Sequence, residues 1–338
     1  GLSAGKKAPK VTKSTQLQDI SLLPLSDAIR EAQKQKHLIP SGSKAEGLYV
    51  GGPREMRTRQ DLTNARTGYD RYLAKDPRGA DWYDRYRAGV SEVTGNNPLQ
   101  NDWMSKMEGQ WSAGVTPESE LAFALKEGNA ALQGTKEMGH YPDQHDALMR
   151  AIDANDPNLM QLGDKTGEYA RLVSPDQPRP AGATGVNDFR AARNWGYTQT
   201  DGGDQTQAMT SAQHHFMDYE TALATNRANQ KALGGRTDWS GEKIQAAPWV
   251  RQKAEAILEN RPAILAKHLK TPGATPESAQ AAAYEEAFNE ANKTIVDFFP
   301  KHTAFATHEA RPGPSTGHLP GSMGATPEQV QAYSSDPL

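Results

Sequence analysis

The stretch from Leu159 to Tyr197 decides the fold: LMQLGDKTGEYARLVSPDQPRPAGATGVNDFRAARNWGY. It places Lys165 after a tight turn and Asp188 before an arginine-bearing helix. We expect a helix from Asp164 to Val173 that stops at Ser174-Pro175, because a proline disfavours helical geometry in the residue before it. The lysine after the turn and the aspartate before the helix form the first candidate site.

The segment ahead of this stretch predicts a second short helix. Asp143 to Asn155 places Leu148 and Ile152 on one helical face, and Asp156-Pro157 then ends the helix. The order is therefore helix, turn, helix, which indicates an all-α domain.

At these residues the chain resembles the helix-hairpin-helix DNA glycosylases. The pattern of that family is an apolar residue, a glycine-rich hairpin, a lysine, a helix, and Val-x-Asp before the next helix. The matching residues are Leu162, Gly163, Lys165, Val186 and Asp188. The resemblance implies a helix-hairpin-helix glycosylase-like fold with DNA contacts from Leu162, Gly163 and Thr166.

The resemblance also implies catalytic roles. Lys165 would attack the sugar C1′ as the nucleophile, and Asp188 would stabilise the developing positive charge. A lysine must lose its proton before it attacks, and partial burial lowers the pKa of an amine.

The hairpin departs from the family pattern at one glycine. Gln161-Leu162-Gly163 stands where the family has Gly-x-Gly, so one glycine that lets the backbone approach a phosphate is missing. The alternative is a helical fold kept without catalysis, in which Lys165 is solvated near a helix N-terminus and Asp188 caps its helix.

A second resemblance covers more of the chain, from about residue 81 to residue 321. It is to the helical domains of large polyvalent proteins of bacteriophages, and it implies a virion-associated or ejected protein. The matching segments, in order, are ADWYDRYRAGVSEVTG (80–95), WSAGVTPESELAFAL (111–125), GDKTGEYARLV (163–173), GEKIQAAPWV (241–250) and PSTGHLPG (314–321).

Composition agrees with a soluble helical protein. The chain has 338 residues, of which 36% are hydrophobic, and a net charge of −3. It lacks an apolar run of the roughly 20 residues that a membrane-spanning helix needs, so we expect no membrane anchor. It also lacks cysteine, which excludes disulfides and thiolate metal ligands. Without a phosphate-binding loop or a dinucleotide fingerprint, we expect no cofactor and no metal.

The expected domain organisation has four parts. Residues 1–16 form a flexible basic arm, residues 17–53 a helix and linker, residues 54–321 the helical glycosylase-like domain, and residues 322–338 a tail with a short helix. The cations of the arm are Lys6, Lys7, Lys10 and Lys13. The arm could contact DNA, or it could be a solvated tail or a strap onto a partner subunit.

Helix starts are marked by three Thr-Pro-Glu sequences that begin at Thr116, Thr275 and Thr326, each with a capping threonine. We also expect one long helix over Arg54–Lys75, and helix over Ile244–Leu269 with interruptions at Pro248 and Pro262.

Two further residues could suggest a metal site. His214 and Asp218 lie one turn apart on the helix expected over residues 207–232. A third ligand is not visible at local spacing, so a surface histidine–carboxylate pair is the preferred interpretation.

Two functional hypotheses remain from the sequence. In the first, the chain is a non-catalytic phage protein that is located in the virion, or in the host cytoplasm after delivery. Its partners would be other virion proteins and double-stranded DNA, and it could form an oligomer. In the second, it is a DNA base-excision glycosylase or lyase that acts on a flipped nucleotide through Lys165 and Asp188.

Overall fold

The computed structural model of the chain describes residues 17, 20–34, 54–55, 59–112, 116–132, 142–160, 162–177, 185–195, 198–199 and 211–298. Over these residues the protein is built from helices apart from one short strand pair, which confirms the all-α part of the predicted fold class. The expected basic arm, most of the linker after residue 34 and the C-terminal tail lie outside the described residues.

The longer helices are α2 (Leu25–Lys34), α4 (Arg59–Lys75), α5 (Trp82–Val93), α6 (Pro98–Trp111), α7 (Pro117–Leu132), α8 (Pro142–Ala154), α9 (Asp164–Val173), α11 (Ser211–Gln230), α12 (Gly241–Asn260), α13 (Pro262–Leu269) and α14 (Pro276–Ala291). The shorter elements are α10 (Phe189–Asn194), α15 (Ile295–Phe298), the 3-10 turns η1 (Arg78–Asp81), η2 (Pro157–Leu159) and η3 (Leu233–Gly235), and the antiparallel pair β1 (Arg54–Glu55) and β2 (Thr198–Gln199).

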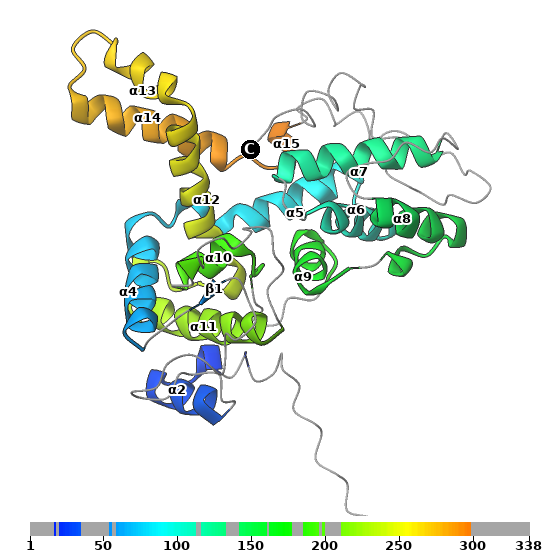
Figure 1. Ribbon diagram of the computed structural model, residues 1–338, viewed down its shortest axis with the longest axis horizontal. Coiled ribbons are helices and arrows are strands. Elements are labelled where there is room, and N and C mark those ends of the chain that lie inside the picture. Colours follow the sequence, from blue (N-terminus) through cyan, green and yellow to red (C-terminus); the bar gives the residue numbers. More distant parts are fainter. Residues whose placement is uncertain are drawn as a thin grey trace, which may run out of the picture.

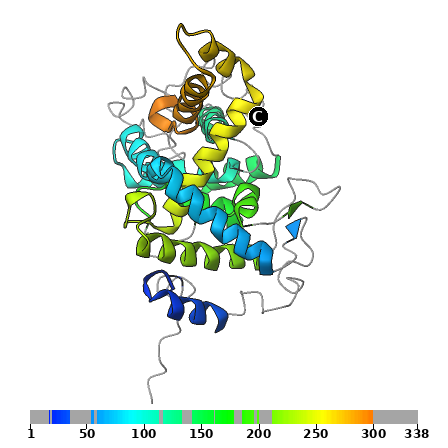
Figure 2. The same cartoon turned by 90° about the vertical axis from the view of Figure 1, so that its left-hand side faces the viewer.

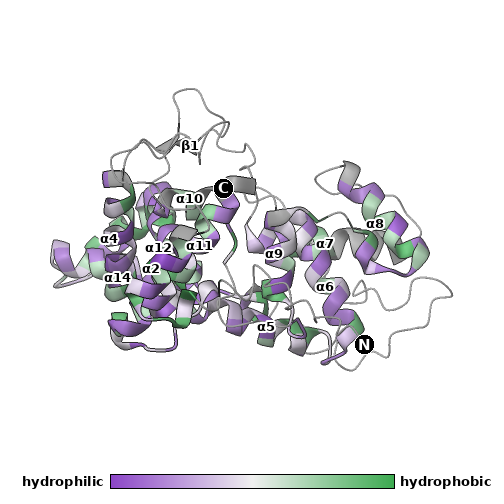
Figure 3. Cartoon of the chain, turned by 90° about the horizontal axis from the view of Figure 1, so that it is seen from below, coloured by the Kyte–Doolittle hydropathy of each residue, from purple (hydrophilic) through white to green (hydrophobic). Residues whose placement is uncertain are grey.

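The helices gather in two groups that α5 connects. Helices α6 to α9 lie on one side, and α4, α10, α11 and α12 lie on the other, with α2 beneath α11 (Figure 1). The hairpin of α13 and α14 projects at the upper left of Figure 1. Figure 3 shows hydrophilic and hydrophobic residues mixed along the labelled helices, and among the described residues no helix combines the length and the apolar character that a membrane span requires.

The largest buried cluster lies where α5, α7, α9, α12 and α14 meet. Trp82 and Tyr86 of α5, Leu172 of α9, Val250 of α12 and Phe288 of α14 all belong to it. The aromatic side chains of α5 are therefore core packing, as expected for apolar residues that recur at helical spacing. Segments far apart in sequence form this core, so it ties the two groups of helices together.

Three further tryptophans are buried in the core. Trp103 and Trp111 of α6 pack with α7 and α8, and Trp195 stacks on Tyr69 with ring centroids 4.2 Å apart. All three tryptophans have an exposed fraction of 1% or less. None of them is therefore available as an exposed wedge for a nucleic-acid base.

The capping chemistry predicted for Thr116 and Thr275 is confirmed. The Thr116 hydroxyl oxygen accepts the Ser119 N–H at 3.3 Å, and that of Thr275 accepts the Ser278 N–H at 3.2 Å. In each case proline occupies the first helical position, where its missing N–H is not needed. The start predicted at Thr326 lies outside the described residues.

Two helix predictions were wrong in part. Arg54 and Glu55 pair with β2 as a short strand, and α4 begins only at Arg59. Pro248 lies inside the continuous helix α12, and the chain breaks only at Pro262. Proline normally disrupts a helix interior. Here α12 is held by tight packing on η1, where a Cβ added to Gly79 would lie 2.8 Å from a Val250 side-chain atom.

Candidate functional site

The turn before α9, where the sequence predicts a hairpin, is closed by Thr166. The Gly163 N–H donates to the Thr166 hydroxyl oxygen at 2.8 Å. Gly163 has an extended backbone, and a Cβ there would meet only that hydroxyl oxygen, at 3.8 Å. Neither backbone conformation nor local packing therefore demands glycine at this position. Leu162 is half-buried and Gly163 is exposed.

Lys165 is half-buried and has a structural partner. Its ammonium donates to the backbone carbonyl of Ser112, the residue that ends α6. The last carbonyls of a helix have no intrahelical donor, and a lysine side chain is a common partner for them. Lys165 therefore joins the start of α9 to the end of α6 and is not simply solvated, which was the sequence-based alternative.

Asp188 caps α10, as the alternative interpretation of the sequence predicted. Its carboxylate accepts the Ala191 N–H at 2.7 Å. Its charge also adds to the effect of burial in raising the pKa of the Tyr69 and Tyr83 hydroxyls. No hydrogen bond or ion pair joins Asp188 to Lys165, both of which the structure describes.

A buried cluster of carboxyls and tyrosines lies next to Lys165. Glu108 of α6 and Glu120 of α7 are 0% and 3% exposed. Both carboxyl oxygens of Glu108, one of Glu120, and the hydroxyls of Tyr86 and Tyr169 make no hydrogen bond of ordinary geometry within the described residues, although Tyr86 lies near Glu108 and Tyr169 near Glu120. Unpaired buried polar atoms are rare in folded proteins, so each needs an explanation.

Burial is the main reason that both carboxyls titrate unusually. It raises the pKa of Glu108 and that of Glu120 from 4.5 to about 8. The Tyr86 hydroxyl lowers the pKa of Glu108, and the positive charge of Lys165 lowers that of Glu120, but in both cases the effect of burial is larger. With such pKa values both groups are neutral acids at pH 7 and could donate a proton.

The cluster contains a signal that sequence reasoning missed. Glu108 shares the apolar face of α6 with Met104, Met107 and Trp111, at helical steps of three and four. A carboxylate seldom lies on a buried face without a cation beside it.

No group of three or more His, Asp or Glu side chains in the described chain could hold a metal ion.

The proposed histidine–carboxylate pair does not lie at the surface. Asp218 is buried, and its carboxylate accepts a hydrogen bond from the Asn187 side-chain amide at 2.6 Å. Asn187 directly precedes Asp188, the residue that caps α10. The bond therefore holds the start of α10 against α11. The surface interpretation was wrong because Asp218 shares the buried stretch of α11 with Phe216 and Tyr219.

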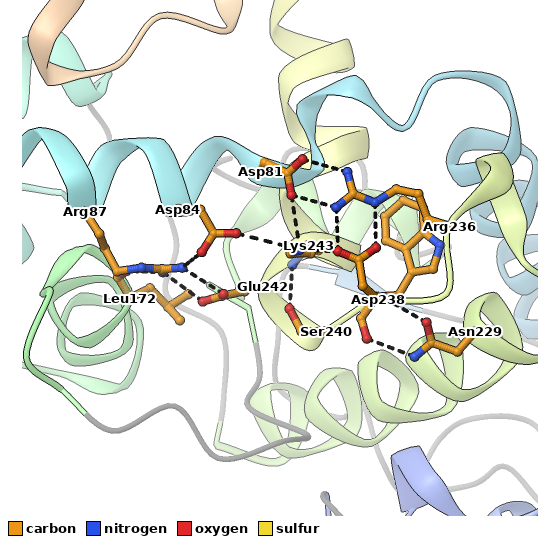
Figure 4. Close-up of polar contacts among 11 residues, drawn as sticks. Asp81, Asp84, Arg87, Leu172, Asn229, Arg236, Asp238, Ser240, Glu242 and Lys243 are labelled. Carbon is orange, nitrogen blue, oxygen red and sulfur yellow. Dashed lines mark hydrogen bonds and ion pairs between the residues drawn. The ribbon is translucent and has the colours of Figure 1, made fainter.

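An ion network joins α5 to the start of α12 (Figure 4). Arg87 makes two hydrogen bonds of 2.9 Å to Glu242 and one of 2.8 Å to the Leu172 carbonyl. Arg236 binds Asp81 through two hydrogen bonds of 2.7 Å and holds the pKa of that carboxyl below its usual value. The network therefore fixes the end of α9 against α5 and α12.

Gly109 determines how closely α6 approaches α9. A Cβ at this position would lie 2.6 Å from the Ala170 Cβ and 2.6 Å from the Thr166 carbonyl oxygen. We expect Gly109→Ala to force the helices apart and to lower the free energy of unfolding by about 1–3 kcal/mol. Chemical denaturation would measure the change.

A matched control for Gly109 is Gly68→Ala in α4. An added Cβ there meets no atom within 4 Å, and alanine favours helix over glycine, so stability should rise slightly. An equal loss of stability in both variants would contradict the role assigned to the close contact of α6 and α9.

Comparisons of the chain with protein families, curated proteins and solved structures found no significant match. The fold and the site define an all-α protein in which Lys165 joins α9 to the end of α6, Asp188 caps α10, and α6 and α7 carry a buried carboxyl cluster. The expected DNA-binding lysines Lys6, Lys7, Lys10 and Lys13 lie outside the described residues.

Proposed function

We propose that the chain is a bacteriophage virion-associated protein, internal to the particle or ejected with the genome, with a non-catalytic helix-hairpin-helix glycosylase-like domain. The observation that carries the non-catalytic part is the structural use of both candidate catalytic groups. Lys165 binds a helix-terminal carbonyl, and Asp188 caps a helix. A nucleophilic lysine must instead be available to a substrate carbon.

The resemblance to large polyvalent phage proteins gains support from where its segments lie. Four of the five matching segments contain, in turn, the end of η1 with α5, the start of α7, α9, and the first half of α12. Residues of all four contribute to the largest core cluster. A shared order of segments that build one core is what a common fold would require. The fifth segment, 314–321, lies outside the described residues.

The proposal gives the domain double-stranded DNA and other virion proteins as partners, and the virion or the host cytoplasm after delivery as its location. DNA contact would come from the hairpin at Leu162, Gly163 and Thr166 and from the N-terminal arm. Contacts of lysines with phosphates release counterions, so such binding weakens steeply as salt rises.

The alternative is a base-excision glycosylase or lyase with Lys165 as nucleophile and Asp188 as its electrostatic partner. One observation favours it: the Lys165 ammonium interacts with Glu120, a buried carboxyl. In its charged form such a carboxyl could accept the proton that a nucleophilic lysine must lose.

Borohydride trapping on duplexes with abasic sites tests both functions. We expect no covalent adduct with the wild-type chain, and duplex binding whose affinity falls between two salt concentrations. An adduct that disappears in Lys165→Ala would overturn the non-catalytic proposal in favour of the lyase. Absence of both adduct and DNA binding would remove DNA from the list of partners.

A further inference from the structure

A cavity of about 490 Å³ lies between α2, α4 and α11, away from the hairpin site. Figures 1 and 2 both show α2 beneath α11, with α4 alongside. Side chains of all three helices line it. Its volume is in the range of sites for small organic ligands.

The walls of the cavity differ in chemistry. Helix α2 contributes the apolar side chains Leu25 and Ile29, and α11 adds Leu223. Helix α4 contributes a polar wall that includes Thr67 and Arg71. A ligand that fills the cavity would therefore meet apolar groups on one side and hydroxyl and guanidinium groups on the other.

The cavity has an excess of positive charge. Four cationic side chains line it against one carboxylate, Asp70. Asp70 is bound by Arg227 at 3.2 Å and by Lys231 at 2.9 Å. Arg66 binds the buried Glu220 behind the wall at 2.6 Å. Even with Glu220 counted, cations outnumber carboxylates, so the cavity favours an anion.

Two of these cations are available to a ligand. Arg71 is exposed and makes no ion pair or hydrogen bond among the described residues. Lys231 pairs with Asp70 through one proton donor, and its side chain is 53% exposed. An ammonium has three donors, so Lys231 can bind an anion without releasing Asp70.

We propose that this cavity binds an amphiphilic organic anion, with a phosphate or carboxylate head at Arg71 and Lys231 and an apolar body against Leu25, Ile29 and Leu223. Both halves of the ligand are required by the lining. The charged head alone would leave the apolar wall in contact with water, and an apolar body alone would leave the excess positive charge unmatched.

Isothermal titration calorimetry on the full chain at low salt tests this proposal. The probes are deoxyadenosine monophosphate, decanoate and inorganic phosphate. We expect at least one of the two organic anions to bind, and inorganic phosphate to bind at least about tenfold more weakly, because it lacks an apolar body. The two organic probes distinguish a phosphate ester from a carboxylate as the preferred head.

Three variants make the test specific. Arg71→Glu should weaken binding of the organic anion by roughly tenfold or more, because it reverses a charge that contacts the head. Ile29→Ser should weaken it through the apolar wall, with circular dichroism to check folding. Arg150→Glu makes the same charge change at an exposed arginine of α8 outside the cavity, and it should have no effect.

Three results would overturn the proposal. The first is no binding of either organic anion at millimolar concentration. The second is inorganic phosphate binding as tightly as the organic anions, since the apolar wall would then play no part. The third is an equal effect of Arg150→Glu and Arg71→Glu, which would assign the binding to overall charge.

Discussion

Glu108→Gln and Glu120→Gln should each make the protein more stable than wild type at pH 8 and above, with a gain that shrinks as pH falls and is lost near pH 4.5. Burial raises the pKa of both carboxyls from 4.5 to about 8. Between these values the folded chain binds more protons than the unfolded chain, so stability falls as pH rises. The stability that each neutral carboxyl contributes is therefore fully present below its unfolded pKa of 4.5. It falls as pH rises and is lost once pH passes the folded pKa of about 8.

The expected effect is large because the pKa changes so much on folding. When the pKa of a carboxyl rises from 4.5 to about 8 on folding, the free energy of unfolding of the protein falls by up to about 5 kcal/mol across that pH range. Glutamine has similar shape and no charge, so it removes this loss. The groups that interact with the two carboxyls are Tyr86 of α5, Glu118 of α7, Lys165 and Tyr169 of α9, and Lys253 of α12.

Chemical denaturation at a series of pH values from about 4 to 9, which spans both pKa values, would measure the difference between wild type and variant. Glu259→Gln, which removes an exposed carboxylate of α12, controls for the loss of one negative charge and should reproduce the wild-type profile. A parallel profile for Glu108→Gln would show that this carboxyl is not desolvated in the folded chain.

The helices around the site could be predicted because their signals are local. The range Asp164–Val173 agrees with the structure at both ends, since a hairpin precedes the helix and Ser174-Pro175 stops it. The range Asp143–Asn155 differs from α8 by one residue at each end. Where the secondary structure of a segment depends on a partner far away in the sequence, the prediction was wrong. Arg54 pairs with Gln199, and no local pattern indicates that pairing.

The roles of the site residues also differ in whether their partners are near or far in the sequence. The capping role of Asp188 could be predicted because its partner, Ala191, is three residues away. The partner of Lys165 is the carbonyl of Ser112, 53 residues earlier, and a backbone carbonyl leaves no mark in a sequence. Glu108 was detectable as an acid on an apolar face, whereas the burial of Glu120 depends on the packing of α7 against α6 and on Tyr169 of α9.

Arg87→Met should be among the most destabilising single substitutions in the chain. Arg87 and Glu242 are both buried, with side chains 5% and 9% exposed, and they share two hydrogen bonds of 2.9 Å. Removal of the arginine leaves the Glu242 carboxylate buried without its cation and the Leu172 carbonyl without its donor. Breaking a buried pair in this way lowers the free energy of unfolding by about 3–5 kcal/mol.

The double variant Arg87→Met/Glu242→Gln distinguishes an unpaired charge from lost packing. If the uncompensated carboxylate causes the loss, neutralising it should recover more than half of the stability, because two neutral side chains need no cation. Arg261→Met, which breaks an exposed pair with Glu290, should change stability by less than about 1 kcal/mol. If the double variant were no more stable than Arg87→Met, the contribution of Arg87 would come from its contacts with α9 rather than from its charge.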